Sequence, residues 1–264
     1  MAIRSSAALA AAAFLAGCGE EAEAPPPPAE AVQAAAQPQG PPACEERRFE
    51  ESRFTACRYD PKRHRLELIG EDEAGPLRSF ARLEQHLGTR AETLLFAMNA
   101  GMYDEEGRPI GLYVADGKQI RSINLNDGPG NFHMKPNGVF TVDAQGRAAV
   151  IPSDRFAAVK ANPHWANQSG PMLVIAGKIH PQFAADGPSR HVRNGVGTDG
   201  SGAAWFAISE DVVSLGRFAR FFRDELGAHD ALFLDGAVSS LWDAPAGRQD
   251  GYSELGPLVA VFRR

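Results

Sequence analysis

The sequence lacks the residue patterns of a metalloprotein and of a protein with several membrane spans. Its three cysteines form no Cys-x-x-Cys pair, and neither His-x-x-x-His nor a Cys/His cluster occurs. This pattern argues against a structural zinc site, and no cofactor is expected, although a divalent ion stays open. After residue 16, no apolar run reaches the length of a membrane-spanning helix.

Motifs of several large enzyme classes are also missing. The sequence contains no Gly-x-Ser-x-Gly, no Walker loop and no His-Glu-x-x-His. It has 27 basic against 33 acidic residues and shows no Lys/Arg cluster, so nucleic acid is not an expected partner. The polar stretches are instead rich in carboxylates, amides, hydroxyls and arginine, which are the groups that recognise sugars and phosphates.

The start of the chain is typical of an exported protein. Residues 1–17 combine a short basic start with an Ala-rich apolar run that is too short for a stable anchor. The run ends in Leu15-Ala16-Gly17-Cys18, which resembles the lipobox of bacterial lipoproteins and implies cleavage before Cys18 and acylation of its thiol. Residue 19 is Gly and not Asp, and the resemblance to such lipoproteins then implies attachment to the outer membrane, facing the periplasm. The alternative is an ordinary secretory signal peptide with an incidental cysteine.

A low-complexity segment follows, and a cysteine pair comes after it. Residues 18–43 are rich in Pro, Glu and Ala and cannot bury enough apolar surface to fold, so we expect a disordered tether. If Cys18 is acylated, Cys44 and Cys57 remain as a pair around a predicted hairpin. In an oxidising periplasm we expect them to form a disulfide, whereas two free thiols would suit a cytosolic protein.

Residues 44–264 are predicted to form one domain of the α+β class, with mixed, hairpin-rich sheets and a few helices. Near the end, a strand at 203–208, a helix at 214–226 and a strand at 231–234 predict one right-handed βαβ crossover with parallel strands. A further helix is expected at 76–87. The other expected strands are 53–59, 65–69, 93–98, 111–115, 119–125, 138–142, 148–151, 172–175, 178–179 and 258–262.

The strand at 231–234 runs directly into Asp235 and Gly236. A carboxylate at the end of a buried strand lies where desolvation and hydrogen bonds tune its pKa, and ligands bind beyond the carboxyl ends of parallel strands. The alternative is that Asp-Gly is only a turn. A Gly-rich loop at 127–138 could hold an anion with its N–H groups and Lys135, or could simply be two turns with Lys135 in solvent.

Six motifs occur in a fixed order. They are Asn99-Ala100-Gly101-Met102-Tyr103 and the segments 128–132, 135–140, 168–173, 193–197 and 234–239. Together they resemble the phosphodiester glycosidase family over residues 53–262. The resemblance implies an α+β fold and hydrolysis of a sugar-1-phosphodiester, such as an N-acetylglucosamine phosphodiester. Where the family has Asp-Gly-Gly-Gly-Ser, this chain has Ala237 and Val238 in place of two glycines, which leaves the substrate open.

The resemblance and the residue types together assign the candidate site. Asp235, as nucleophile or base, Arg193 and Asn99 are the expected catalytic residues, and Glu210, Asp104 and Asp127 are alternative second carboxylates. A non-catalytic envelope lipoprotein that binds a glycan or phosphoglycan is the rival interpretation, and a phosphodiesterase that breaks the P–O bond is a third. The expected substrate-binding residues are Gly101, Asn131, Lys135, Asn137, Ser169, Gly170, Asn194, Gly236 and Ser239.

Overall fold

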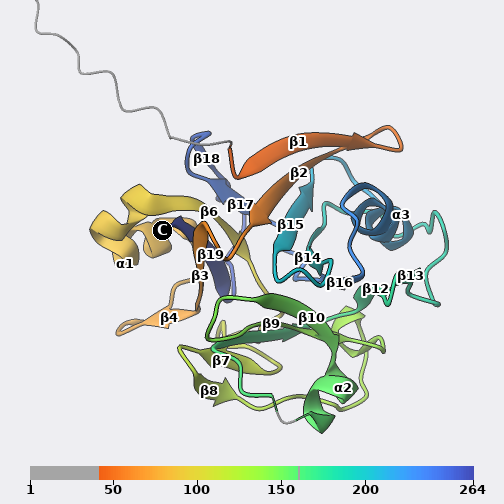
Figure 1. Cartoon of the computed structure of the whole chain (residues 1–264), viewed down its shortest axis with the longest axis horizontal. Coiled ribbons are helices and arrows are strands. Elements are labelled where there is room, and N and C mark those ends of the chain that lie inside the picture. Colours follow the sequence, from red (N-terminus) through yellow and green to blue (C-terminus); the bar gives the residue numbers. More distant parts are fainter. Residues whose placement is uncertain (1–41, 160) are drawn as a thin grey trace, which may run out of the picture. The chain divides into compact units, whose positions relative to one another are not determined.

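The structure, a computed structural model, describes residues 42–159 and 161–264. The predicted signal peptide, Cys18 and nearly all of the predicted tether lie outside the described residues. Within the described part, the chain forms three large β-sheets and a two-stranded one, with short helices around them (Figure 1). None of the described helices is long and apolar enough to cross a membrane. The α+β prediction is therefore confirmed in a sheet-dominated form.

Sheet 1 has seven strands in the order β1-β2-β15-β14-β16-β12-β13. All of its pairings are antiparallel. Its strands are β1 (Cys44–Phe49), β2 (Ser52–Tyr59), β12 (Met172–Ile175), β13 (Lys178–Ile179), β14 (Asn194–Thr198), β15 (Ala204–Ser209) and β16 (Asp230–Phe233).

Sheets 2 and 3 have five strands each, also antiparallel, in the orders β10-β9-β11-β7-β8 and β18-β17-β6-β19-β3. Sheet 2 contains β7 (Tyr113–Ala115), β8 (Lys118–Arg121), β9 (Gly138–Val142), β10 (Ala148–Pro152) and β11 (Trp165–Ser169). Sheet 3 contains β3 (His64–Ile69), β6 (Leu94–Asn99), β17 (Leu241–Asp243), β18 (Arg248–Gln249) and β19 (Leu258–Arg263). The small sheet pairs β4 (Glu71–Asp72) with β5 (Gly75–Pro76).

The helices are short and capped by residues that favour their ends. Ser79 and Ser214 each accept a hydrogen bond from the backbone N–H three residues later, which starts α1 and α3. Gly88 and Gly227 follow the helical stretches with positive φ. The helices are α1 (Phe80–Leu87), η1 (Gly88–Thr93), η2 (Asn131–His133), α2 (Ser153–Ala158), α3 (Leu215–Arg220) and the π-helical η3 (Phe221–Glu225).

The main core lies between the three large sheets. It joins Phe96 of sheet 3, Phe140 of sheet 2 and Phe206 of sheet 1. The Phe206 ring lies 5.6 Å from that of Phe96 and 5.4 Å from that of Phe140. Each sheet also packs apolar side chains against a helix: sheet 1 against α3 and η3, sheet 3 against α1, and sheet 2 against α2. Burial of these faces provides the main driving force for this arrangement.

The predicted cysteine hairpin is confirmed. Cys44 lies directly opposite Cys57 in the β1–β2 pair, and the two form a disulfide. The hairpin turns at Glu50 and Glu51, which both have positive φ, as a tight two-residue hairpin turn requires. Glu50 also forms ion pairs with Arg217 and Arg220, which tie the turn to α3.

The predicted βαβ crossover does not form a parallel pair. β15, α3, η3 and β16 do follow one another, but β14 lies between the two strands and pairs antiparallel with each. The two strands thus run in the same direction without being hydrogen-bonded neighbours. The predicted handedness of this connection stays a prediction.

Candidate active site

Sheets 1 and 3 meet where β6 and β16 end and β14 begins. Asn99 is the last residue of β6, and Asn194 is the first residue of β14. The Asn194 side-chain amide donates to the backbone oxygen of Asn99 at 2.8 Å and to its Oδ1 at 3.0 Å. Sheet 2 approaches the same region, because a Cβ on Gly101 would lie 2.4 Å from the Asn167 side chain of β11. Residues from all three sheets therefore position this region.

Asn99 holds the turn that contains Asp235. Its Nδ2 donates to the backbone oxygen of Asp235 at 2.7 Å, and its Oδ1 accepts from the backbone N–H of Ser240 at 2.8 Å. Asn99 is only 1% exposed. Since its amide bonds inward on both sides, the geometry favours a positioning role for Asn99 rather than direct contact with a substrate. Asn194 acts similarly, because its Oδ1 accepts from the Ser239 hydroxyl at 3.1 Å.

Asp235 follows β16 and lies half-buried at the edge of this network. Its backbone N–H donates to Ala100 at 3.0 Å, and its Oδ1 accepts from the backbone N–H of Ala237 at 3.1 Å. Among the described residues, no group donates a hydrogen bond to its other carboxylate oxygen. Burial raises the pKa of Asp235, and the single Ala237 hydrogen bond opposes that shift only in part. A carboxylate of this kind is more basic than one in water.

The turn at 236–239 explains how Ala237 and Val238 replace glycines. None of these four residues has a positive φ, so the backbone of this turn accepts side chains. Gly236 is different, because a Cβ there would lie 2.2 Å from the Phe233 ring. Close packing therefore requires a glycine at position 236, whereas the backbone at positions 237 and 238 also accepts Ala237 and Val238.

A cavity of about 180 Å³ opens above this turn. Besides the turn residues 236–240 and Val192, it is lined by His191, Tyr252 and Ser253. The Tyr252 side chain is 93% exposed. Sequence reasoning missed these three residues, since each is an isolated polar or aromatic residue in a loop. An exposed aromatic at the rim of a polar cavity is the only signal that could have drawn attention to Tyr252, and it requires the structure.

Arg193 is buried with its charge uncompensated. It is 2% exposed, and its guanidinium lies over the Phe233 ring at 5.4 Å. Its Nε donates to Val213 and its Nη2 to Ser189, both to backbone oxygens at 2.8 Å. No carboxylate among the described residues pairs with it, and burial lowers the pKa of Arg193 to about 10. A buried cation without a counter-ion favours binding of an anion nearby.

The predicted residues of sheet 2 form a tightly packed wall. Ser169 is fully buried, and its hydroxyl has no hydrogen-bond partner among the described residues. Gly170 has no room for a side chain, since a Cβ would lie 2.6 Å from the Asn137 side chain. Asn137 itself donates from Nδ2 to Phe132 at 2.8 Å. Gly170 and Asn137 thus fix the loop against the start of β12.

Lys135 is engaged within its own loop. Its Nζ donates to the backbone oxygen of Leu125 at 2.8 Å and forms an ion pair with Asp127 at 2.6 Å. Asn131 is half-buried, and its backbone oxygen accepts from Met134 at 3.2 Å. These contacts are those of a structured turn, and no ligand is needed to explain them.

The three alternative second carboxylates each have a cationic partner. Asp127 pairs with Lys135, Asp104 with Arg108 at 3.2 Å, and Glu210 with Arg248 at 2.5 Å. Within the described residues, no group of three or more His, Cys, Asp or Glu side chains is arranged to hold a metal ion. The groups around the Asp235 turn are hydroxyls and amides, and Arg193 lies over the Phe233 ring that packs against Gly236. Hydroxyls, amides and a nearby arginine suit a sugar phosphate.

A comparison with models of protein families identifies the family of this chain. The model of the phosphodiester glycosidase family matches residues 92–253, a stretch that includes Asn99, Ser169, Arg193, Asp235 and Ser239. The chain belongs to the phosphodiester glycosidase family. The expected resemblance is thereby confirmed. The family match supports hydrolase activity at the level of the family, while the substrate of this member is a separate question.

The chain is also similar to one curated protein. Over 146 residues it is 38% identical to the uncharacterized protein YigE of Escherichia coli K12, which covers 55% of this chain and 57% of that protein. The chain thus matches little more than half the length of this curated relative.

Among solved structures, the fold resembles the catalytic domain of zebrafish N-acetylglucosamine-1-phosphodiester alpha-N-acetylglucosaminidase, auto-inhibited by its pro-peptide. The TM-score is 0.55 at 17% identity, covering 88% of this chain and 87% of that one. It also resembles a protein of Burkholderia pseudomallei K96243 named as an exported protein, with a TM-score of 0.53 at 13% identity over 80% and 74% of the two chains. At these identities the likenesses show a shared fold.

Proposed function

We propose that this protein hydrolyses a sugar-1-phosphodiester and releases the free sugar, with an N-acetylglucosamine phosphodiester as the first substrate to test. The observation that carries the proposal is Asp235 in a member of this family. It is a half-buried carboxylate of raised pKa, next to the cavity above residues 236–240, and one of its oxygens receives no hydrogen bond from the described residues. A carboxylate in this setting suits attack on an anomeric carbon, or activation of a water there.

Arg193 and Ser239 supply the binding side of the proposal. A phosphodiester near the turn would provide the counter-ion that Arg193 lacks, and it could accept a hydrogen bond from the Ser239 hydroxyl. A phosphate monoester is a good leaving group, so the reaction depends less on a strong general acid than ordinary glycoside hydrolysis does. This accounts for a site in which Asp104, Asp127 and Glu210 are each held by a cation.

The same ion pairs also favour a second candidate function. A glycan-binding protein of the cell envelope needs no second carboxylate, and in this chain none of the three candidates is free of a cationic partner. In that case the cavity and Tyr252 would hold a phosphoglycan without cleaving it. In either case we propose an exported lipoprotein, attached through acylated Cys18 to the outer membrane and facing the periplasm.

The test is release of free sugar from an N-acetylglucosamine-1-phosphodiester by the purified protein. Replacing Asp235 by Asn should lower kcat by at least about 100-fold, since one ionisable group at the reacting carbon contributes a factor of this order. Asp243→Asn is the matched control, because burial also raises the pKa of Asp243 although it lies on β17, outside the site. Undiminished turnover in Asp235→Asn would refute the role of Asp235.

Two further outcomes separate the alternatives. In ¹⁸O-labelled water, cleavage at the anomeric carbon labels the sugar, whereas cleavage of the P–O bond labels the phosphate and would identify a phosphodiesterase. Tight binding of sugar phosphodiesters without hydrolysis of any of them would identify a binding protein.

A further inference from the structure

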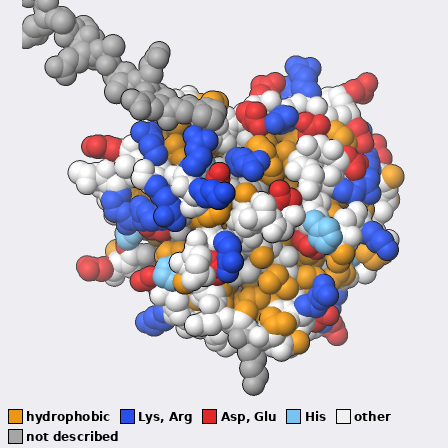
Figure 2. All heavy atoms as spheres, in the orientation of Figure 1, with side chains coloured by type: hydrophobic (Ala, Val, Ile, Leu, Met, Phe, Trp, Pro, Cys, Tyr) orange, Lys and Arg blue, Asp and Glu red, His pale blue; other side chains and the backbone are white. Residues whose placement is uncertain are grey.

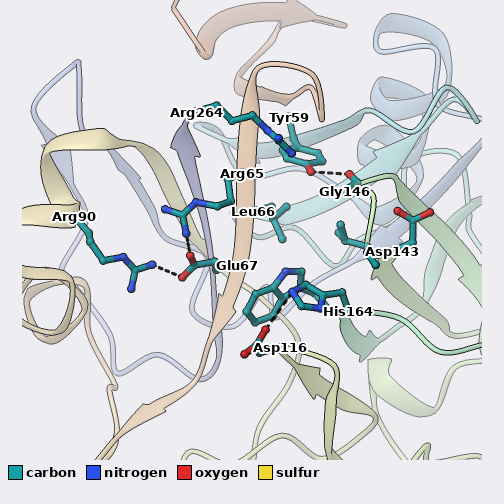
Figure 3. A pocket seen from close by; sticks show the side chains of 13 residues that line it. Tyr59, Arg65, Leu66, Glu67, Arg90, Asp116, Asp143, Gly146, His164 and Arg264 are labelled. Carbon is teal, nitrogen blue, oxygen red and sulfur yellow. Dashed lines mark hydrogen bonds and ion pairs between the residues drawn. The ribbon is translucent and has the colours of Figure 1, made fainter.

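The described part of the chain holds a second cavity, of about 480 Å³ (Figure 3). On β6, Asn99 near the candidate active site is paired with Leu258, whereas Leu94 at the other end of the strand is paired with Phe262. Arg65, which lines the second cavity, is also opposite Phe262. Five residue-to-residue steps along β6 separate Leu94 from Asn99, a distance of about 17 Å. The cavity is therefore distinct from the site described above.

Three arginines form one wall of this cavity: Arg65, Arg90 and Arg264. Arg65 and Arg90 both lie over the ring of Phe262, at 4.7 and 5.4 Å, and both donate to the carboxylate of Glu67. Figure 3 shows Glu67 between these two guanidiniums. Arg65 and Arg90 thus share the carboxylate of Glu67, while Arg264 does not bond to it.

Arg264 is the least compensated of the three. Its Nε donates to the backbone oxygen of His64 at 3.0 Å, and no carboxylate among the described side chains pairs with it. Figure 3 shows its guanidinium beside the Tyr59 ring. Burial, together with the neighbouring Arg90 and Arg264 guanidiniums, lowers the pKa of Arg65. The three cations therefore repel one another, and an anion between them would relieve that repulsion.

The facing wall carries aromatic rings and carboxylates that already have partners. Asp143 pairs with Arg147 at 2.8 Å, and Asp116 lies 3.3 Å from the His164 ring. Half-buried Trp165 also lines the cavity, whereas Tyr59 is buried beside Arg264 and its hydroxyl donates to Gly146 at 2.6 Å. An aromatic ring across from arginines and polar groups is suited to a sugar ring that carries an anionic substituent.

The fold also gathers basic residues beside this cavity that are far apart in the sequence. Antiparallel pairing of β3 with β19 sets Arg65 opposite Phe262 and His64 opposite Arg263. This pairing places residues 62–65 beside residues 262–264, although the two segments are far apart in the sequence. Together they hold five Lys and Arg residues, in a protein of net charge −6. Figure 2 shows blue side chains gathered on the side where Figure 1 places the C-terminal end. The surface potential there favours approach of an anion.

We propose that this cavity binds an anionic saccharide, that is, a sugar bearing a phosphate or a carboxylate, independently of the site at Asp235. Its volume falls within the range of about 300–1,000 Å³ that small-molecule sites occupy. A lone phosphate would fill only part of it and would leave Trp165 without a contact. The arginines would bind the anionic group, and the aromatic side would take the ring.

The test uses the fluorescence of Trp165 in the full chain. N-acetylglucosamine 6-phosphate and glucuronic acid are the anionic probes, because neither is a glycosyl phosphodiester; neutral N-acetylglucosamine and inorganic phosphate are the controls. At least one anionic sugar should bind saturably and at least about tenfold more tightly than either control. The Trp165→Phe variant should lose the fluorescence change, which assigns the signal to this cavity.

Charge variants then locate the anion. Arg65→Gln/Arg264→Gln should weaken binding by about tenfold or more, as expected when charge-assisted hydrogen bonds are lost. Arg223→Gln is the matched control, since Arg223 pairs with its neighbour Asp224 and does not line this cavity, and it should bind as the wild type does. Asp235→Asn should also bind normally, so this result does not depend on the proposed activity.

Three results would overturn the proposal. They are the absence of any saturable change with either anionic sugar, equal affinity for inorganic phosphate and the sugars, and unchanged affinity in the double arginine variant. Thermal unfolding of each variant, followed in parallel, separates loss of the cavity's charge from loss of the fold. If Arg65→Gln/Arg264→Gln unfolds, the single variants give the same comparison.

Discussion

Asp235 combines a position useful for chemistry with an environment that opposes its charge. Its carboxylate is half-buried and receives one hydrogen bond, from Ala237. Burial therefore raises its pKa above the ordinary 3.8. A group whose pKa is higher in the folded state than in the unfolded state destabilises the fold wherever it is ionised, and this penalty is absent below the unfolded pKa. Function and stability thus make opposite demands on this residue.

The first prediction follows from the raised pKa of Asp235, which makes its ionised form destabilising. Asp235→Asn should raise the melting temperature at pH 7, and the difference should vanish below about pH 4, where the wild-type carboxyl is protonated in both states. Asp104→Asn provides the opposite case, because hydrogen bonds from the Arg108 backbone lower the pKa of Asp104 and its loss should lower the melting temperature. A pH-independent effect of Asp235→Asn in scanning calorimetry would contradict the argument.

A second prediction concerns Tyr252 at the rim of the site. Because its side chain is almost fully exposed, Tyr252→Ala should leave the melting temperature unchanged. If the ring stacks on the substrate, the same change should raise KM by about tenfold, the value of one stacking contact. Tyr252→Phe keeps the ring and should retain the wild-type KM. Steady-state kinetics with both variants would show whether the ring or the hydroxyl matters.

At the scale of elements, β14 is the strand on which sheet 1 depends. It lies between β15 and β16 and contains Gly195 and Gly197. A Cβ at Gly195 would lie 2.8 Å from the backbone oxygen of Leu232, and one at Gly197 would lie 2.6 Å from the Phe222 ring. The spacing of Gly195, Gly197 and Gly200 matches a dinucleotide-binding fingerprint, yet it falls within a strand and its turn and not between a strand and a helix.

A third prediction tests this packing. Gly197→Ala should destabilise the protein by about 1–3 kcal/mol, because the added methyl group has no space beside Phe222 and Ala228. Gly251→Ala is the matched control, since a Cβ there meets nothing within 4 Å and its φ is not positive. Urea unfolding of both variants provides the comparison, and equal stabilities would contradict the packing argument.

The sequence predicted the hairpins well and the glycine-rich strands poorly. An apolar run before Ala176 and Gly177 and a short apolar segment after them defined β12 and β13 to the residue. β14 and β11 were missed because their residues are small or polar, and only burial against neighbouring sheets makes them strands. Long-range pairing of this kind leaves no local pattern in the sequence.

The candidate site was likewise predicted only in part from the sequence. Motif order pointed to Asp235 and Asn99, because both follow recognisable strands. The inward hydrogen bonds of Asn99 and the ion pair of Lys135 depend on partners that only the fold brings near. Tyr252 and His191 carry no motif at all, so their place beside the turn could not be predicted.

At the scale of the whole molecule, the described domain places two cavities of different character at opposite ends of its strands. The one at Asp235 is small and bordered by a turn, and the one at Arg65 is larger and lined by three arginines and three carboxylates. A protein that holds a glycan at one end and acts on a sugar phosphodiester at the other would act best on material kept near a surface. The proposed lipid anchor would provide such a location.

The fourth prediction concerns that anchor. Cys18→Ser should move the protein from the membrane fraction to the soluble fraction and should abolish incorporation of labelled palmitate, because acyl chains provide the attachment. Activity on a soluble sugar phosphodiester should not change, since the site lies in residues 92–253. Retention of the variant in the membrane fraction would point to another means of attachment.

The hydrogen-bond network beneath Asp235 has one more consequence. Asn99, Asn194, Ser239 and Ser240 contribute only amides, hydroxyls and peptide groups, none of which gains or loses a proton between pH 3 and 9. The hydrogen bonds of these four residues are therefore the same in acid as at neutrality. The acidic limb of a pH–rate profile of the proposed hydrolysis would then report the ionisation of Asp235 and the loss of its bond to Ala237.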